Sequence, residues 1–208
     1  MDAFSDFYFD ALSEIINIAT GRAAQGLSDV IGESVQSYVP IVDLLKCTDV
    51  SVESLRLNEN KFGVITQEIS GLINAELMLL FTEENVLRIV RKVMGAELNI
   101  EVVPEFEKEV MCELGNIMMN ACVSSIADML HVPIASGLPH YAIKTKEEIG
   151  EYIKNQHLSD FILSSHVDLA IEQHLTEGKL FFLINTITLN NIANEINKVS
   201  KMRDTVQN

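Results

Sequence analysis

The feature that most constrains the fold of this chain is an internal repeat. The pair Glu14-x-x-Asn17 recurs 99 residues later as Glu113-x-x-Asn116, and Pro40 recurs as Pro139 at the same offset. Only four prolines occur among the 208 residues, so composition alone rarely places two of them in register. Similarity at a fixed spacing is typical of a duplicated structural unit. Common descent of two halves is the simplest source of this pattern.

A second similarity lies at the ends of the two halves. Segments 79–82 and 183–186 each close an apolar run and precede a helix-like segment, 104 residues apart. We therefore expect two homologous halves, 1–103 and 104–208, that meet near Pro104. No Ser-, Gly- or Pro-rich linker separates them, which predicts one pseudo-symmetric domain over 1–208 rather than two domains.

Each half predicts the same order of elements: a long helix, a short strand at the proline, two longer strands and a closing helix. Ser70-Gly71 and Glu177-Gly178 are turn signals between the longer strands. The expected strands are 62–69 and 75–81, then 161–171 and 179–184, and the closing helices are Glu83–Met94 and Ile187–Lys201. Strands of both halves are expected to share one antiparallel sheet flanked by the long helices, an α+β fold.

Composition excludes several classes of protein. Thirty acidic against fifteen basic side chains give a formal charge of −15, and no basic cluster offers a surface for nucleic acid or for an anionic membrane. The longest apolar stretches span about five residues, far fewer than the roughly 20 that cross a bilayer. Three cysteines form no CxxC pair and the first residues lack the basic start of a signal peptide, so we expect a cytoplasmic protein.

The two long helices present the repeated polar residues on one side. At 100° per residue, the apolar positions of each helix form one stripe, and the polar positions fall on the opposite side. In the first helix the stripe is Leu12, Ile15, Ile16, Ala19, Ala23 and Leu27, and the outward residues are Asp10, Glu14, Asn17 and Gly21. In the second it is Met111, Leu114, Met118 and Cys122, with Glu109, Glu113, Asn116 and Asn120 outward.

A single Glu-x-x-Asn on a helix surface ordinarily contacts solvent and has no further function. Two copies at equivalent places, each followed 23 residues later by proline, carry more weight. Common descent explains the pairing, but it does not explain why solvent-facing Glu and Asn recur while the buried faces differ. We therefore take the two Glu–Asn pairs as candidate functional residues.

These residues resemble the signature of the CheC/CheX/FliY family of chemotaxis phosphatases, [Asp/Ser]-x3-Glu-x2-Asn-x22-Pro. Asp10, Glu14, Asn17 and Pro40 match it, and Glu109, Glu113, Asn116 and Pro139 match it except at the first position. The resemblance covers the whole chain, and the tandem motifs and the length are those of CheC members. Glu109 departs from the family's Asp or Ser and adds a carboxylate beside Glu113.

The resemblance implies hydrolysis of the aspartyl phosphate of the response regulator CheY. Asn17 and Asn116 would orient the attacking water, and Glu14 and Glu113 would anchor the lysine beside the regulator's phosphoaspartate. Asp10, Glu109, Pro40 and Pro139 are expected to have supporting roles, the prolines by directing the backbone. The expected protein has no cofactor or metal site of its own, because Mg²⁺ comes with the regulator and the five histidines show no metal-ligand spacing.

The resemblance also implies binding of the receptor deamidase CheD. An alternative function is therefore a non-catalytic adaptor that sequesters or regulates CheD. Two retained Glu–Asn pairs favour catalysis, since a purely regulatory member could lose one. No single residue is assigned to CheD, and the acidic segment 147–154 is the candidate region for its binding. A pocket enzyme has no support, because the sequence shows no phosphate-binding glycine loop and no CxxxxxR phosphatase loop.

Overall fold

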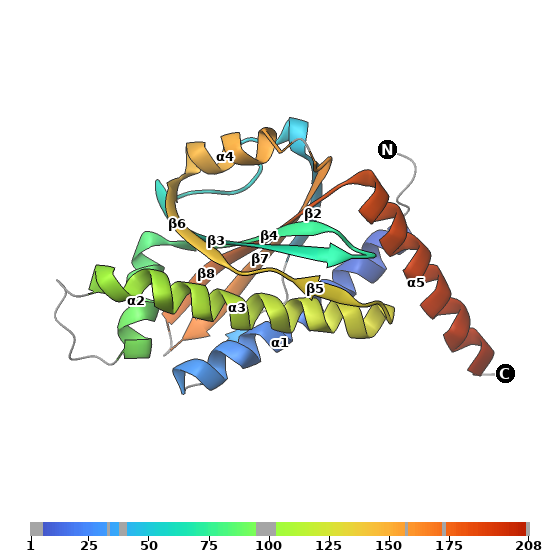
Figure 1. The fold of residues 1–208 in the computed structure, drawn as a ribbon, viewed down its shortest axis with the longest axis horizontal. Coiled ribbons are helices and arrows are strands. Elements are labelled where there is room, and N and C mark those ends of the chain that lie inside the picture. The colour runs from blue at the N-terminus through green and yellow to red at the C-terminus, as the bar shows by residue number, and fades with distance from the viewer. Residues whose placement is uncertain are drawn as a thin grey trace.

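The computed structural model describes residues 6–32, 34–37, 41–94, 103–156, 158–171 and 174–206. These residues form an α+β fold in which one antiparallel sheet is flanked by helices (Figure 1). The elements are α1 (Asp6–Ile31), β1 (Gln36–Ser37), β2 (Ile41–Lys46), the 3-10 turn η1 (Cys47–Asp49), β3 (Lys61–Gly71), β4 (Ala75–Thr82), α2 (Glu83–Met94), α3 (Val103–Leu130), β5 (Ile134–Ser136), β6 (His140–Thr145), α4 (Lys146–Lys154), β7 (Phe161–Ile171), β8 (His174–Ile184) and α5 (Thr186–Val206).

Strands from the two parts of the chain share one sheet, with β7 and β8 adjacent to each other and β4 adjacent to β3. Its order is β1-β7-β8-β4-β3-β5, with β2 also paired to β7 and β6 also paired to β3. β4 and β8 lie side by side at the centre, where Leu79 pairs with Leu180. The shared antiparallel sheet expected from the sequence is confirmed. The elements in the two parts of the chain follow the same order, with α4 in the place of the 3-10 turn η1, while a repeat by common origin stays a prediction.

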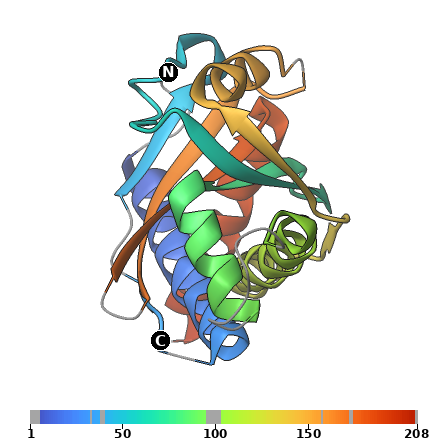
Figure 2. The same ribbon diagram turned by 90° about the vertical axis from the view of Figure 1, so that its left-hand side faces the viewer.

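Helices cover both faces of the sheet. α1 and α3 run antiparallel across one face together with α2 and α5, and α4 packs on the other face with the segment 47–57 (Figures 1 and 2). Alternate residues of β4 therefore enter two cores: Leu77, Leu79 and Phe81 contact the α1–α3 side, whereas Met78 and Leu80 contact the α4 side. Burial on both faces explains why residues 77–81 form an unbroken apolar run.

The helix α3 approaches the sheet closely at a glycine. A Cβ atom built at Gly115 would lie 2.6 Å from Cγ2 of Ile65 on β3, so only hydrogen fits there. The neighbouring helix is also close, because a Cβ at Gly26 of α1 would lie 3.1 Å from Cγ2 of Ile117. Small residues thus set the distance of α3 from both the sheet and α1.

The segment Phe106–Leu130 of α3 is long and apolar enough to cross a membrane, by length and composition alone. More than half of its most apolar stretch is buried within the protein, against α1 and the sheet. Core packing accounts for its apolar character.

The structure corrects the predicted turn at Glu177-Gly178. Both residues lie inside β8, where Gly178 pairs with Val167 of β7 and with Phe81 of β4. The strands β7 and β8 instead meet across residues 172–173, which lie outside the described residues. Pairing on both sides outweighs the local turn preference of the Glu-Gly sequence.

The helix α4 was not predicted, although the sequence carries a signal for it. Thr145 accepts a hydrogen bond from the backbone N–H of Glu148, and the Glu148 carboxylate accepts one from the backbone N–H of Thr145. This capping box starts a helix whose Ile149 and Ile153 are buried under the sheet. The pattern Thr-x-x-Glu before an apolar pair would have located it.

The close approach of α3 leads to a stability prediction. Gly115→Ala should lower the free energy of unfolding by about 1–3 kcal/mol, because the added methyl group overlaps Ile65. Gly21→Ala is the matched control: its Cβ meets nothing within 4 Å, so it should raise stability by about 0.5–1 kcal/mol. Urea unfolding of both variants measures the difference. If the two variants proved equally stable, the Ile65 side chain would be able to move away from the added methyl group at no cost in stability.

Candidate functional site

The first Glu–Asn pair lies on α1. Asp10 and Glu14 are exposed, and Asn17 is half-buried. The Oδ1 atom of Asn17 is buried and accepts no hydrogen bond from the described residues. Pro40, predicted to support this pair, lies outside the described residues.

Asn17 is covered more than its helical angle predicts because the buried side of α1 is wider than the predicted stripe. Thr20 and Ala24 are buried in addition to the six predicted apolar residues, which are all buried. Asn17 lies next to these two residues on the helix surface, at the border of the buried side. Glu14 lies farther round and stays exposed.

The second pair lies on α3. Glu109 and Glu113 are exposed and Asn116 is half-buried. Pro139 lies beside this part of the helix, because its carbonyl accepts a 3.8 Å hydrogen bond from Sγ of Cys112. The strand β6 begins directly after this proline. The structure therefore places Pro139 beside the helix that carries the second pair.

An open groove of about 960 Å³ adjoins the second pair. Its polar border includes Glu109, Glu113 and Asn116, and its apolar lining includes Phe106 and Leu138. Leu138 is 81% exposed, which is unusual for a leucine and makes it a candidate contact for another protein. The groove is too open to enclose a small molecule, but its mixed border suits a protein surface.

Asn116 belongs to a chain of three amides that reaches into the core. Its Oδ1 accepts a 2.8 Å hydrogen bond from Nδ2 of Asn120, and Oδ1 of Asn120 accepts a 3.3 Å bond from Nε2 of Gln67. Nε2 of Gln67 also donates to the carbonyl of Gly137 at 2.9 Å. Asn120, predicted to point into solvent, is half-buried because it joins this amide chain.

Gln67 was not predicted as part of the site, although its position in the sequence indicates a buried polar side chain. It lies on β3 between Ile65 and Ile69, two residues from each, so strand alternation puts it on the core side. The structure leaves it only 1% exposed. A glutamine on the core side of an apolar strand needs hydrogen-bond partners, and it finds them in Asn120 and Gly137.

A second polar contact ties β6 to α3 near the groove. The hydroxyl of Tyr141 donates a 2.5 Å hydrogen bond to the carboxylate of Glu107. Burial, followed by the adjacent Glu107 carboxylate, raises the pKa of Tyr141 far above its ordinary value. Tyr141 therefore stays protonated and holds the edge strand against the helix that carries the second pair.

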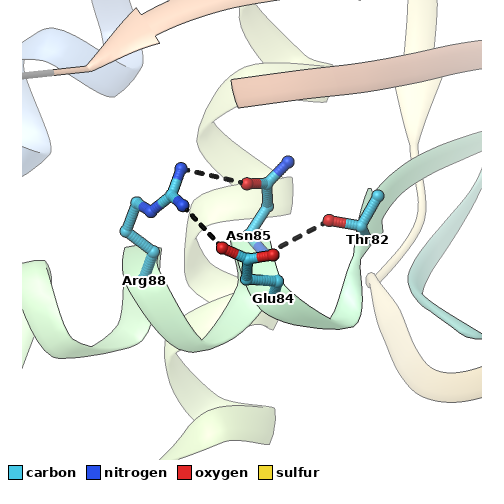
Figure 3. Close-up of polar contacts among 4 residues, drawn as sticks. All are labelled: Thr82, Glu84, Asn85 and Arg88. Atoms are coloured by element: carbon cyan, nitrogen blue, oxygen red, sulfur yellow. Dashed lines mark hydrogen bonds and ion pairs between the residues drawn. The ribbon is translucent and has the colours of Figure 1, made fainter. Parts of the chain in front are cut away.

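A more polar hollow of about 720 Å³ lies at the start of α2. Arg88 donates to Glu84 at 2.9 Å and to Asn85 at 3.3 Å, while the backbone N–H of Asn85 donates to the hydroxyl of Thr82 (Figure 3). The other arginine of the hollow, Arg56, pairs with the Asp43 carboxylate at 3.3 Å. Because carboxylates already neutralise both arginines, we assign no function to this hollow.

Among the described residues, no three His, Cys, Asp or Glu side chains lie close enough together to hold a metal ion.

The three cysteines differ in accessibility, which gives a direct test of the groove. Burial raises the pKa of the Cys122 thiol to about 12, and burial with the nearby Asp160 carboxylate raises that of Cys47 to about 11. Cys112 is partly exposed in the groove. A maleimide should therefore label Cys112 in the native protein and the other two only after unfolding, because the thiolate is the reactive form. Peptide mapping by mass spectrometry identifies the labelled cysteine, with Cys112→Ser as control. Labelling of Cys47 or Cys122 before Cys112 in the native protein would contradict the described burial.

No family model matches the sequence. Solved structures with a similar fold include FliY of Thermotoga maritima, with a TM-score of 0.75 at 19% identity, covering 95% of this chain and 99% of that one. FliM in the FliM–SpeE complex of H. pylori gives a TM-score of 0.66 at 8% identity, with 94% and 97% covered.

CheX in a CheX–CheY–BeF3–Mg²⁺ complex from Borrelia burgdorferi is also similar. Its TM-score is 0.53 at 14% identity, covering 83% of this chain and 96% of that one. At these identities the comparisons establish the fold. The chain adopts the fold of the CheC/CheX/FliY family of chemotaxis proteins, which the middle domain of FliM shares.

Proposed function

We propose that this protein is a cytoplasmic phosphatase that hydrolyses the aspartyl phosphate of the response regulator CheY. The observation that carries the proposal is the placement of two Glu–Asn pairs on α1 and α3, each with an exposed glutamate and a half-buried asparagine. A CheX of the same fold has been solved in complex with CheY. The non-enzymatic role of a FliM-like protein would need neither pair.

The chemistry requires positioning more than covalent participation. Hydrolysis of an acyl phosphate needs a water molecule in line with the leaving aspartate oxygen, and the charge gathers on the phosphoryl oxygens. An asparagine suits this task because its Oδ1 accepts a hydrogen bond from the water while its Nδ2 can donate to a phosphoryl oxygen. It also stays neutral, whereas an aspartate at position 17 or 116 would repel the phosphoryl group.

Glu14 and Glu113 would fix the register of the two proteins. Each lies one helical turn before its asparagine and is exposed, so its carboxylate can reach a lysine of the docked regulator. A charge-assisted bond of this kind is directional and strengthens as docking removes water. The formal charge of −15 gives no long-range attraction to an acidic partner, so association depends on such local pairs and on shape.

The surface around the second pair supports protein docking. The exposed Leu138 and the half-buried Phe106 offer apolar contact beside Glu113 and Asn116. The regulator supplies its own aspartate and Mg²⁺ as part of the substrate, so this protein needs no enclosed pocket. An open, partly apolar groove is the surface that such a reaction uses.

Binding of CheD is a second proposed activity. The acidic segment 147–154 forms most of α4, whose Glu147 and Glu151 are exposed. This helix packs on the face of the sheet opposite α1 and α3 (Figure 1). A partner bound to α4 would leave both Glu–Asn pairs accessible. Phosphatase activity and CheD binding are therefore compatible in one molecule.

The test follows the decay of phosphorylated CheY with wild type, Asn17→Ala, Asn116→Ala and the double variant. Loss of a positioned polar group costs about 100-fold or more in rate at the site that carries it. Each single variant should keep the activity of the other pair, and the double variant should show only the regulator's own rate of decay.

Asn190→Ala on the exposed side of α5 is the matched control and should leave the rate unchanged. The same double variant should still bind CheD in a pull-down. Wild-type decay of phosphorylated CheY with the double variant would refute the phosphatase and support the adaptor.

A further inference from the structure

We propose that Gln67 and Asn120 are positioning residues for Asn116, and that they make the second Glu–Asn pair the faster of the two sites. The inference rests on the proposed phosphatase function and deepens it. Neither residue would touch the phosphoryl group; both act through the Asn116 side chain.

One backbone carbonyl determines which end of each amide donates and which end accepts a hydrogen bond along the whole chain of amides. The carbonyl of Gly137 can only accept, so the amino group Nε2 of Gln67 must point toward it, at 2.9 Å. The same amino group lies 3.3 Å from the Asn120 side chain, which therefore turns its Oδ1 inward. Nδ2 of Asn120 is then left to donate to Oδ1 of Asn116 at 2.8 Å.

The inner end of the chain is held rigidly. Gln67 is 1% exposed on β3, and the backbone N–H of Gly137 donates a 2.8 Å bond to the carbonyl of Glu68 next to it. The Oε1 atom of Gln67 is buried without a partner among the described residues. Because only the amino group of Gln67 is hydrogen-bonded, the contribution of this residue lies in the two bonds that it donates, and an apolar side chain in its place would leave the Gly137 carbonyl and Oδ1 of Asn120 without this donor.

This arrangement prepares Asn116 for the reaction. Oδ1 of Asn116 has two acceptor positions, and Asn120 occupies one of them. The amide is thereby held in one orientation, with the second acceptor position available for a water molecule and Nδ2 for a phosphoryl oxygen. A side chain that is oriented before the substrate docks loses less freedom on reaching the transition state.

Within the described part of the chain, no comparable donor supports the first pair. Asn120 follows Asn116 by four residues, but the residue four positions after Asn17 is Gly21, which has no side chain to donate. Oδ1 of Asn17 is buried and has no partner among the described residues. The amide of Asn17 must therefore reorient when substrate docks, and the first pair should turn over more slowly.

The test isolates each pair. In an Asn17→Ala background, Asn120→Asp keeps the shape and the bond from Gln67 but replaces the donor that faces Asn116 by an acceptor. Its kcat for phosphorylated CheY should fall about 10- to 100-fold with KM unchanged, because the loss is one of positioning. Gln67→Leu should also lower kcat. Asn190→Asp, the matched change of charge on exposed α5, should alter neither value.

The reverse experiment uses an Asn116→Ala background, in which the first pair acts alone. Gly21→Asn places a donor four residues after Asn17 and should raise kcat, whereas Gly21→Ala, which also has open space for its Cβ, should not. Melting temperatures confirm that all variants fold. Parental kcat values for both Asn120→Asp and Gln67→Leu would overturn the proposal, provided that Asn116→Ala abolishes activity in the Asn17→Ala background. If the Asn17→Ala, Asn116→Ala double variant still dephosphorylates CheY faster than the regulator's own rate, the phosphatase function of the two pairs is itself wrong. If the Asn17→Ala variant is slower than the Asn116→Ala variant, the second pair is not the faster site and the present proposal is overturned.

Discussion

The close contact between Gly115 of α3 and Ile65 of β3 is the constraint from which the arrangement of this protein follows. A Cβ atom has no room there, so the helix lies against the sheet closely enough for side chains of modest length to meet. Two residues farther along β3, Gln67 reaches Asn120 of the same helix. Asn120 in turn donates a hydrogen bond to Asn116, so the packing of α3 on the sheet contributes to the orientation of a candidate functional residue.

α1 and α3 each carry one Glu–Asn pair, but the two asparagines differ in the hydrogen bonds that hold their side chains. Two antiparallel helices carry Glu–Asn pairs at equivalent places, which gives two surfaces of the same chemical type. Their surroundings differ: Asn116 accepts a hydrogen bond from a neighbour anchored in the core, whereas Oδ1 of Asn17 is buried without a partner among the described residues.

Much of the fold could be predicted because strong periodicity marks it. The apolar stripes of α1 and α3, the helix Glu83–Met94 and the strand Phe161–Ile171 lie where the sequence places them. The turn predicted at Glu177-Gly178 was wrong because strand pairing on both sides overrides a local preference. Of the site, the exposed Glu14 and Glu113 followed from helical geometry. The burial of Asn17 and the bond from Gln67 did not, since they depend on neighbours distant in the sequence.

The response of the asparagine side chains to the activated regulator would show directly whether the two Glu–Asn pairs meet the phosphoryl group. Protein labelled with ¹⁵N would be titrated with CheY, with and without beryllium fluoride and Mg²⁺, and the side-chain amide resonances of Asn17 and Asn116 followed by NMR. Both resonances should shift with the activated regulator and much less with the inactive one. If they stay unchanged while resonances of residues outside α1 and α3 respond, the regulator binds elsewhere and the two pairs have no part in its dephosphorylation.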